Sequence, residues 1–98
     1  MLIYGMIKKE AQRNENMIAQ YEQLIKELPK GSLICRKKDY YYLKYREGGK
    51  VFDEYIGKDP EAVDQVREKL ELRKHYMEML SVLKKEKKAI QKIMEGIT

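Results

Sequence analysis

The sequence predicts an α+β fold: an N-terminal helix, then a three-stranded antiparallel β-meander, then a long C-terminal helix. Two observations support this order. Apolar residues recur every three or four positions in the first and last thirds of the chain, but every second position between residues 32 and 57. Glycine and proline residues separate the three parts. Because a chain of 98 residues builds one modest core, we expect a single domain over residues 1–98.

The first helix is expected over about residues 5–28, where a heptad stripe alternates steps of four and three. The stripe consists of Ile7, Ala11, Asn14, Ile18, Tyr21, Ile25 and Leu28. A helix places these residues on one face and leaves the charged residues between them on the other. Asn14 either fixes the register or number of partner helices, or lies exposed near a frayed end. Pro29 and Gly31 end the helix.

The meander is expected over about residues 32–57, because Gly48 and Gly49 supply the positive φ angles of a tight two-residue turn. The predicted pairs around this turn are Glu47 with Lys50, Arg46 with Val51, Tyr45 with Phe52, Lys44 with Asp53, Leu43 with Glu54, Tyr42 with Tyr55 and Tyr41 with Ile56. Several of them join opposite charges or apolar rings, as stable cross-strand pairs do. Residues 32–36 form a third strand of open register, since Lys37 and Lys38 suit a tight turn poorly.

Strand alternation assigns the sheet residues to two faces. The packing face is expected to hold Ile34, Tyr41, Leu43, Tyr45, Phe52 and Ile56. The opposite face is expected to hold Tyr40, Tyr42, Lys44, Arg46, Asp53 and Tyr55. The tyrosines of the meander therefore divide between a packing role and a charged, open surface.

The last helix is expected over about residues 60–95, with Asp59 as N-cap and Pro60 at its first position. It is roughly 55 Å long, against about 36 Å for the first helix, so roughly a dozen C-terminal residues should extend beyond that helix without a partner in the chain. The apolar residues expected to form an oligomer or partner interface there are Met79, Leu83, Ile90, Ile93, Met94 and Ile97. We expect a homodimer.

Composition restricts the class of partner and the location. The net charge of +5 favours polyanions or acidic proteins as partners. Cys35 is the only cysteine, so an intrachain disulfide is impossible and a reducing, cytoplasmic location is expected. The apolar opening before Lys8 is shorter than a membrane span, and no signal-peptide pattern follows it. We expect no membrane partner.

No catalytic or metal site is evident in the sequence. Because His75 is the only histidine and Cys35 the only thiol, neither zinc-ligand spacing nor a Ser-His-Asp or Cys-His set can be assembled. We interpret His75 as a surface or partly covered imidazole, and Cys35 as a small buried hydrophobic residue. The glycines match no nucleotide-binding loop. The expectation is a non-catalytic protein with no metal and no cofactor.

The best functional candidate combines tyrosine rings with basic side chains of the meander. We call it the basic-aromatic face and define it as Arg36, Lys37, Lys38, Tyr40, Tyr42, Lys44, Arg46, Tyr55 and Lys58. Such a sheet can stack bases and neutralise phosphates, or enter a duplex groove. The alternative is structural, because tyrosines on the open side of a sheet also cover charged stems without binding anything.

A second basic patch lies in the last helix and consists of Lys84, Lys85, Lys87, Lys88 and Lys92. It has two interpretations. The patch either binds a phosphate backbone, with affinity that falls steeply with salt, or is a solvated helix end whose lysines favour the helix dipole. The solvated end is the commoner of the two.

Two segments carry a resemblance to known proteins. "LPKGSL" and "YYYLKYREGGKVFDEYIGK", within residues 28–60, resemble the signature of an uncharacterised prokaryotic family of small helix–meander–helix proteins from mobile-element or host-defence settings. The resemblance implies a fold and no activity. A weaker similarity is to the three-stranded DNA-binding sheets at the N-termini of phage-type integrases, which have hairpins like "YREGGK". Here no recombinase domain follows, and the flanking helices are much longer.

These observations lead to two hypotheses of different classes. The first is a small nucleic-acid-binding or accessory protein that acts through the basic-aromatic face, with DNA and RNA both open. The second is a protein-binding module that acts through its long helices. An antitoxin, an inhibitor of a defence complex such as an anti-CRISPR-type protein, or an assembly adaptor would be of this kind.

Overall fold

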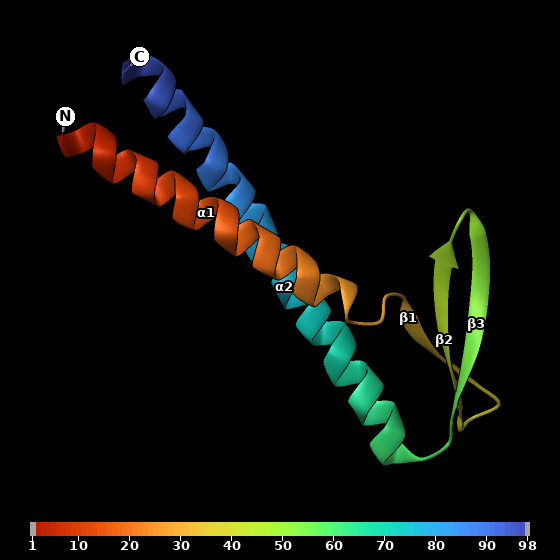
Figure 1. The fold of residues 1–98 in the computed structure, drawn as a ribbon. Coiled ribbons are helices and arrows are strands. Elements are labelled where there is room, and N and C mark those ends of the chain that lie inside the picture. The colour runs from red at the N-terminus through yellow and green to blue at the C-terminus, as the bar shows by residue number, and fades with distance from the viewer. Residues whose placement is uncertain (1, 98) are drawn as a thin grey trace. The chain divides into compact units, whose positions relative to one another are not determined.

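The computed structural model describes residues 2–97 and confirms the predicted α+β fold class (Figure 1). Its elements in chain order are α1 (Leu2–Lys26), β1 (Ser32–Arg36), β2 (Tyr40–Glu47), β3 (Lys50–Gly57) and α2 (Pro60–Ile97). The chain divides into two compact units. We call residues 2–27 with 75–97 the helical unit, and Leu28–Lys74 the sheet unit. That the two fold as a single domain stays a prediction.

The start of α2 is capped as the sequence predicts. The Oδ1 atom of Asp59 accepts a hydrogen bond from the backbone N–H of Glu61 at 3.2 Å, and its carbonyl accepts from Val63 at 3.0 Å. Pro60 occupies the first helical position, where its missing N–H costs nothing. Asp59 therefore satisfies a donor that the first helical turn would otherwise leave without a partner.

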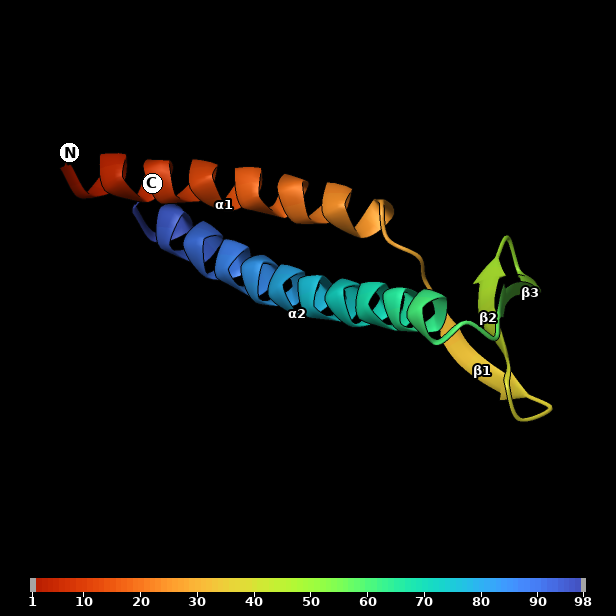
Figure 2. The same cartoon turned by 90° about the horizontal axis from the view of Figure 1, so that it is seen from below.

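The helical unit consists of α1 and residues 75–97 of α2, which lie side by side in Figure 2. Tyr21 and Tyr76 contact edge to face, with ring centroids 5.5 Å apart, and Asn14 contacts Leu83. Residue numbers fall along one helix as they rise along the other, so the pair is antiparallel. At 1.5 Å per residue, α1 is about 37 Å long and residues 75–97 about 35 Å. The two lengths match.

This pairing overturns the expectation that the C-terminal residues lack a partner in the chain. Ile90 and Met94 are half-buried and line a cavity together with Ala11 and Asn14 of α1. Leu83 is only 5% exposed. The prediction failed because it paired α1 with the beginning of α2, whereas residues 60–74 belong to the sheet unit.

Asn14 lies in the core of the helical unit with 1% of its surface exposed. Its Nδ2 donates to the carbonyl oxygen of Leu83 at 2.9 Å and to Oε1 of Glu86 at 3.2 Å. No donor among the described residues reaches its Oδ1. A buried polar group with directional partners fixes the helix register. Of the two predicted alternatives, the frayed and exposed position is therefore wrong.

The sheet has strand order β1-β2-β3 with antiparallel pairing throughout. The predicted pairs from Glu47–Lys50 to Tyr42–Tyr55 are confirmed. The next pair differs, because Tyr41 lies opposite Gly57 and a register shift leaves Ile56 as an extra residue. This β-bulge, with Gly57 at φ +120°, bends the strand at its end.

The register of β1 corrects one assignment of faces. Ile34 lies opposite Tyr42, on the face that was predicted to be open, whereas Leu33 lies opposite Leu43. Leu43 is 4% exposed and Val63 of α2 is 3% exposed, and both belong to the sheet unit. The buried apolar side chains of this unit are therefore Leu43 in β2 and Val63 in the first turn of α2.

Candidate nucleic-acid interface

The strand register brings the predicted binding residues to one face of the sheet. Tyr40, Tyr42, Lys44 and Arg46 alternate along β2, and Arg36 and Tyr55 lie opposite two of them on the neighbouring strands. Lys37 and Lys38 lie in the β1–β2 turn with Asp39, and Lys58 follows β3. Alternation along β2 and pairing with β3 predicted the shared face of Tyr40, Tyr42, Lys44, Arg46 and Tyr55, whereas the place of Arg36 depends on the register of β1.

Arg36 extends across β2 and joins the two outer strands. Its guanidinium lies 4.9 Å from the centroid of the Tyr42 ring, and its Nη2 donates to Oδ2 of Asp53 on β3 at 2.9 Å. The side chains of Arg36 and Asp53 are 48% and 34% exposed. The ion pair neutralises the carboxylate of Asp53, which would otherwise repel a polyanion from this face.

The three tyrosine rings form a continuous cluster. Tyr55 contacts Tyr42 at 5.3 Å and Tyr40 at 6.3 Å between ring centroids, and the ammonium of Lys58 lies 4.9 Å from the Tyr40 ring. Tyr40 and Tyr42 are half-buried, whereas Tyr55 is 54% exposed. The sequence pattern does not distinguish the three tyrosines from one another. The structure leaves Tyr55 as the ring most accessible for stacking.

A cavity of about 370 Å³ adjoins the cluster and is lined by Arg36, Lys37, Tyr40 and Tyr42. Two cations and two aromatic rings thus surround one concave site. Guanidinium and ammonium groups are the usual donors to phosphate oxygens, and tyrosine rings accept stacked bases. The lining of this cavity therefore offers donors for a phosphate and rings for a base.

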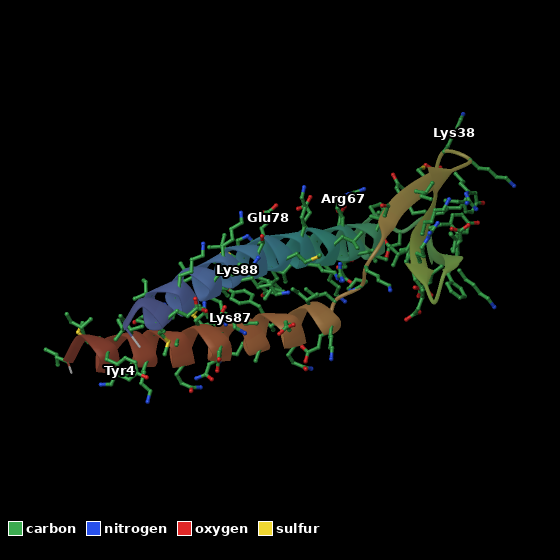
Figure 3. The ribbon with its side chains drawn as sticks, turned by 90° about the horizontal axis from the view of Figure 1, so that it is seen from above. Tyr4, Lys38, Arg67, Glu78, Lys87 and Lys88 are labelled. Carbon is green, nitrogen blue, oxygen red and sulfur yellow. The ribbon has the colours of Figure 1, made fainter. Side chains whose placement is uncertain are left out.

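The β1–β2 turn places two lysines in a backbone conformation that usually favours glycine. Lys37 has φ +51° and Lys38 φ +74°, where a side chain costs about 1–2 kcal/mol per residue. The backbone N–H of Asp39 donates to the Lys37 carbonyl at 3.0 Å, and the Cys35 thiol to the Lys38 carbonyl at 3.0 Å. Figure 3 shows Lys38 projecting from the turn. Sequence reasoning had judged these lysines poor turn residues, and the structure places them there nevertheless.

The remaining cations of the face point to solvent. Lys44 and Arg46 are exposed on β2, and neither forms an ion pair with any residue between 2 and 97. Val51, opposite Arg46, is 51% exposed. The packing face is less fully covered than predicted, since Tyr45 stacks on Phe52 at 5.4 Å while Phe52 stays 42% exposed.

The second basic patch belongs to the helical unit. Lys87 is half-buried and lines the same cavity as Asn14, whereas Lys84, Lys85 and Lys88 are exposed and line a groove described below. Lys92 is exposed.

The two residues considered for chemistry are both at the surface. His75 is exposed and contacts the Tyr76 ring at 6.1 Å. Cys35 is exposed, so its assignment as a buried hydrophobic residue is wrong. The pairing of β1 with β2 places Cys35 opposite Tyr41, near the end of the sheet. Within residues 2–97, no cluster of three histidine, cysteine or acidic side chains could hold a metal ion.

The fold and this face define a class: small α+β proteins in which a three-stranded meander with an exposed basic and aromatic face lies between two helices in the chain. The chain belongs to the family described as Domain of unknown function (DUF6788), whose model matches residues 7–68. No curated protein and no solved structure matches the chain. Neither helix, over the residues described, has a stretch long and apolar enough to cross a membrane.

Proposed function

We propose that this protein is a non-catalytic nucleic-acid-binding or accessory protein that binds through the basic-aromatic face. The observation that carries the proposal is the cluster in which Tyr55, 54% exposed, is surrounded by rings and cations on a single sheet face. Stacking on a tyrosine contributes about 1–3 kcal/mol per base. Cations beside it release counterions from the phosphate backbone, which makes binding depend on salt.

The strained lysines of the β1–β2 turn support the same proposal. Strained backbone persists where the surrounding structure or the function requires it, and glycine at either position would remove the strain. Two lysines at this site keep two positive charges beside the cavity of Arg36 and Tyr40. A phosphate bound there would give these charges a role.

The test is a fluorescence-anisotropy titration with matched single- and double-stranded DNA and RNA at two salt concentrations. The variant Lys44→Glu with Arg46→Glu should weaken binding at least about thirtyfold, because two phosphate contacts become repulsions. Its control, Lys9→Glu with Lys26→Glu, changes the net charge equally but lies on α1. Equal losses in both variants would mean that only net charge matters, and the face would drop out of the proposal.

The biological context and the cellular compartment are a further part of this proposal. The resemblance of the meander to proteins of mobile elements and host defence, and to integrase sheets, supports a role near nucleic acid in a reducing, cytoplasmic compartment. The homodimer also stays a prediction. Of its expected interface, Leu83 is buried within the chain, and Ile93, 51% exposed, is accessible to a second copy. Light scattering of the purified chain would measure the mass directly.

A further inference from the structure

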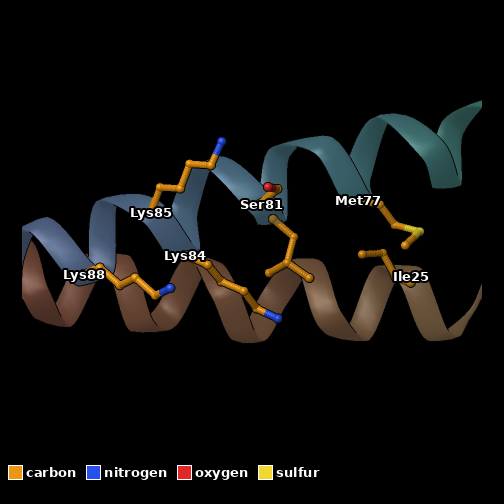
Figure 4. A pocket seen from close by; sticks show the side chains of 7 residues that line it. Ile25, Met77, Ser81, Lys84, Lys85 and Lys88 are labelled. Atoms are coloured by element: carbon orange, nitrogen blue, oxygen red, sulfur yellow. The ribbon is translucent and has the colours of Figure 1, made fainter.

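A groove of about 470 Å³ lies along α2 in the helical unit (Figure 4). Its apolar lining comes from Ile25 of α1 and from Met77 and Leu80 of α2, with Ser81 beside them. Met77 is 49% exposed. The groove therefore exposes apolar surface beside the helix pair.

Three lysines, Lys84, Lys85 and Lys88, line the same groove. No ion pair joins any of them to a residue between 2 and 97. The intervening carboxylate, Glu86, accepts a hydrogen bond from the buried Asn14 instead. The groove thus combines an apolar lining with a positive rim that this unit does not neutralise by direct contact.

We propose that this groove binds an acidic amphipathic helix of a partner protein. A helix in a groove presents apolar side chains at three- and four-residue steps, which suits the lining formed by Ile25, Met77 and Leu80. Lys84 and Lys88 lie one helical turn apart, so carboxylates four residues apart on the partner would meet both of them.

The length of the groove sets the size of this partner segment. Residues 77–88 extend about 16 Å along α2, which corresponds to about three turns of a bound helix. A methionine in the lining adapts to side chains of different shapes, because its thioether chain is flexible and polarisable. The apolar lining also favours a protein over nucleic acid, since a phosphate backbone gains nothing from contact with Ile25 or Leu80.

This inference is independent of the proposed function, because it uses the helical unit and no residue of the basic-aromatic face. The probe is a labelled synthetic peptide of about three helical turns, with leucines on one face and glutamates beside them. A matched peptide carries glutamine in place of each glutamate. Both are titrated against the full-length chain by fluorescence anisotropy, and a short DNA duplex serves as competitor.

The acidic peptide should bind at least about tenfold more tightly than the glutamine peptide. Lys84→Glu with Lys88→Glu should weaken the binding of the acidic peptide by at least about tenfold. Met77→Ser should weaken the binding of both peptides. Lys44→Glu with Arg46→Glu should leave it unchanged. If Lys84→Glu with Lys88→Glu lowers the helical circular dichroism, Lys84→Gln with Lys88→Gln serves in its place.

Three results would overturn the inference: no binding of the acidic peptide, equal binding of the two peptides, or unchanged binding to the lysine variants. Competition by the DNA duplex that disappears in Lys84→Glu with Lys88→Glu would identify a phosphate site instead. That result would also overturn the acidic-helix proposal. Loss of nucleic-acid binding at the sheet, by contrast, bears only on the proposed function.

Discussion

The helical unit and the sheet unit use their polar side chains in opposite ways. In the helical unit, Asn14 is 1% exposed and donates both hydrogen bonds inward, to Leu83 and Glu86. In the sheet unit, Tyr55 is 54% exposed, and Lys44 and Arg46 on the same face are exposed without an ion pair to any residue between 2 and 97. The first arrangement specifies how two helices fit together. The second leaves an aromatic ring and cations exposed, and this difference is the reason for proposing the sheet as a binding surface.

The two turns of the sheet show the same difference at smaller scale. Gly48 and Gly49 have φ +58° and +79°, and Lys37 and Lys38 have φ +51° and +74°. The φ angles are nearly the same, yet glycine adopts them without strain and lysine does not. One turn is therefore formed by the residue type suited to it, and the other retains charge at the expense of stability.

The largest expected effect tests the buried polar contact of Asn14 in the helical unit. Asn14→Asp should lower the free energy of unfolding by about 3–5 kcal/mol, because a buried carboxylate would face Glu86 and could donate to neither acceptor. Urea unfolding followed by circular dichroism at neutral pH measures this loss. Acidic pH, at which the introduced carboxyl binds a proton, should reduce it.

Asn14→Leu is the matched control. It should change the stability by less than about 1 kcal/mol, because the Leu83 carbonyl keeps its place in α2 and Oδ1, which no described donor reaches, is removed. If Asn14→Asp cost no more than Asn14→Leu, Asn14 would not be the polar contact that fixes the helix register.

The second effect concerns Gly31, which directly precedes β1. Gly31 has φ +116°, and a Cβ atom there would overlap the carbonyl oxygen of Lys44 and the Cβ of Tyr45. Gly31→Ala should therefore cost about 2–4 kcal/mol, from strain and displaced backbone together. Urea unfolding followed by circular dichroism gives the change in the free energy of unfolding.

Gly57 offers a matched control with nearly the same φ, +120°, and no atom within 4 Å of an added Cβ. Gly57→Ala should show the conformational strain alone, about 1–2 kcal/mol. Equal losses at both positions would show that the close approach of Gly31 to β2 contributes nothing.

The helix and strand positions were largely predictable from periodicity, and the contacts between elements were not. The heptad stripe and the Gly48–Gly49 turn predicted the helices and the β2–β3 register, since local spacing determines both. The stripe on α2 showed which side of the helix is apolar but not which element covers it, so the pairing of Ile90 and Met94 with α1 was missed. The bulge at Ile56 and the face of Ile34 depend on backbone geometry that residue types alone do not reveal.

The third effect separates the tyrosines of the candidate site. Tyr55→Ala should weaken nucleic-acid binding by about tenfold or more, since it removes the exposed ring available for stacking. Tyr45→Ala, on the opposite face, should lower stability while leaving the affinity of the folded protein nearly unchanged. Anisotropy titrations with single-stranded DNA measure the first effect and urea unfolding the second. A larger affinity loss at Tyr45 would reverse the assignment of the two faces.

The smallest expected effect concerns the β1–β2 turn, where stability and binding should change in opposite directions. Lys37→Gly with Lys38→Gly should raise the free energy of unfolding by about 1 kcal/mol, because glycine relieves the positive-φ strain but loses more chain entropy on folding. The same variant should bind nucleic acid more weakly, with a salt dependence reduced by about one to two phosphate contacts. Opposite changes in stability and affinity would show that the lysines are kept for binding. A stability gain without a loss of affinity would assign the turn no part in recognition, and the charge for recognition would then come from the other cations of the face.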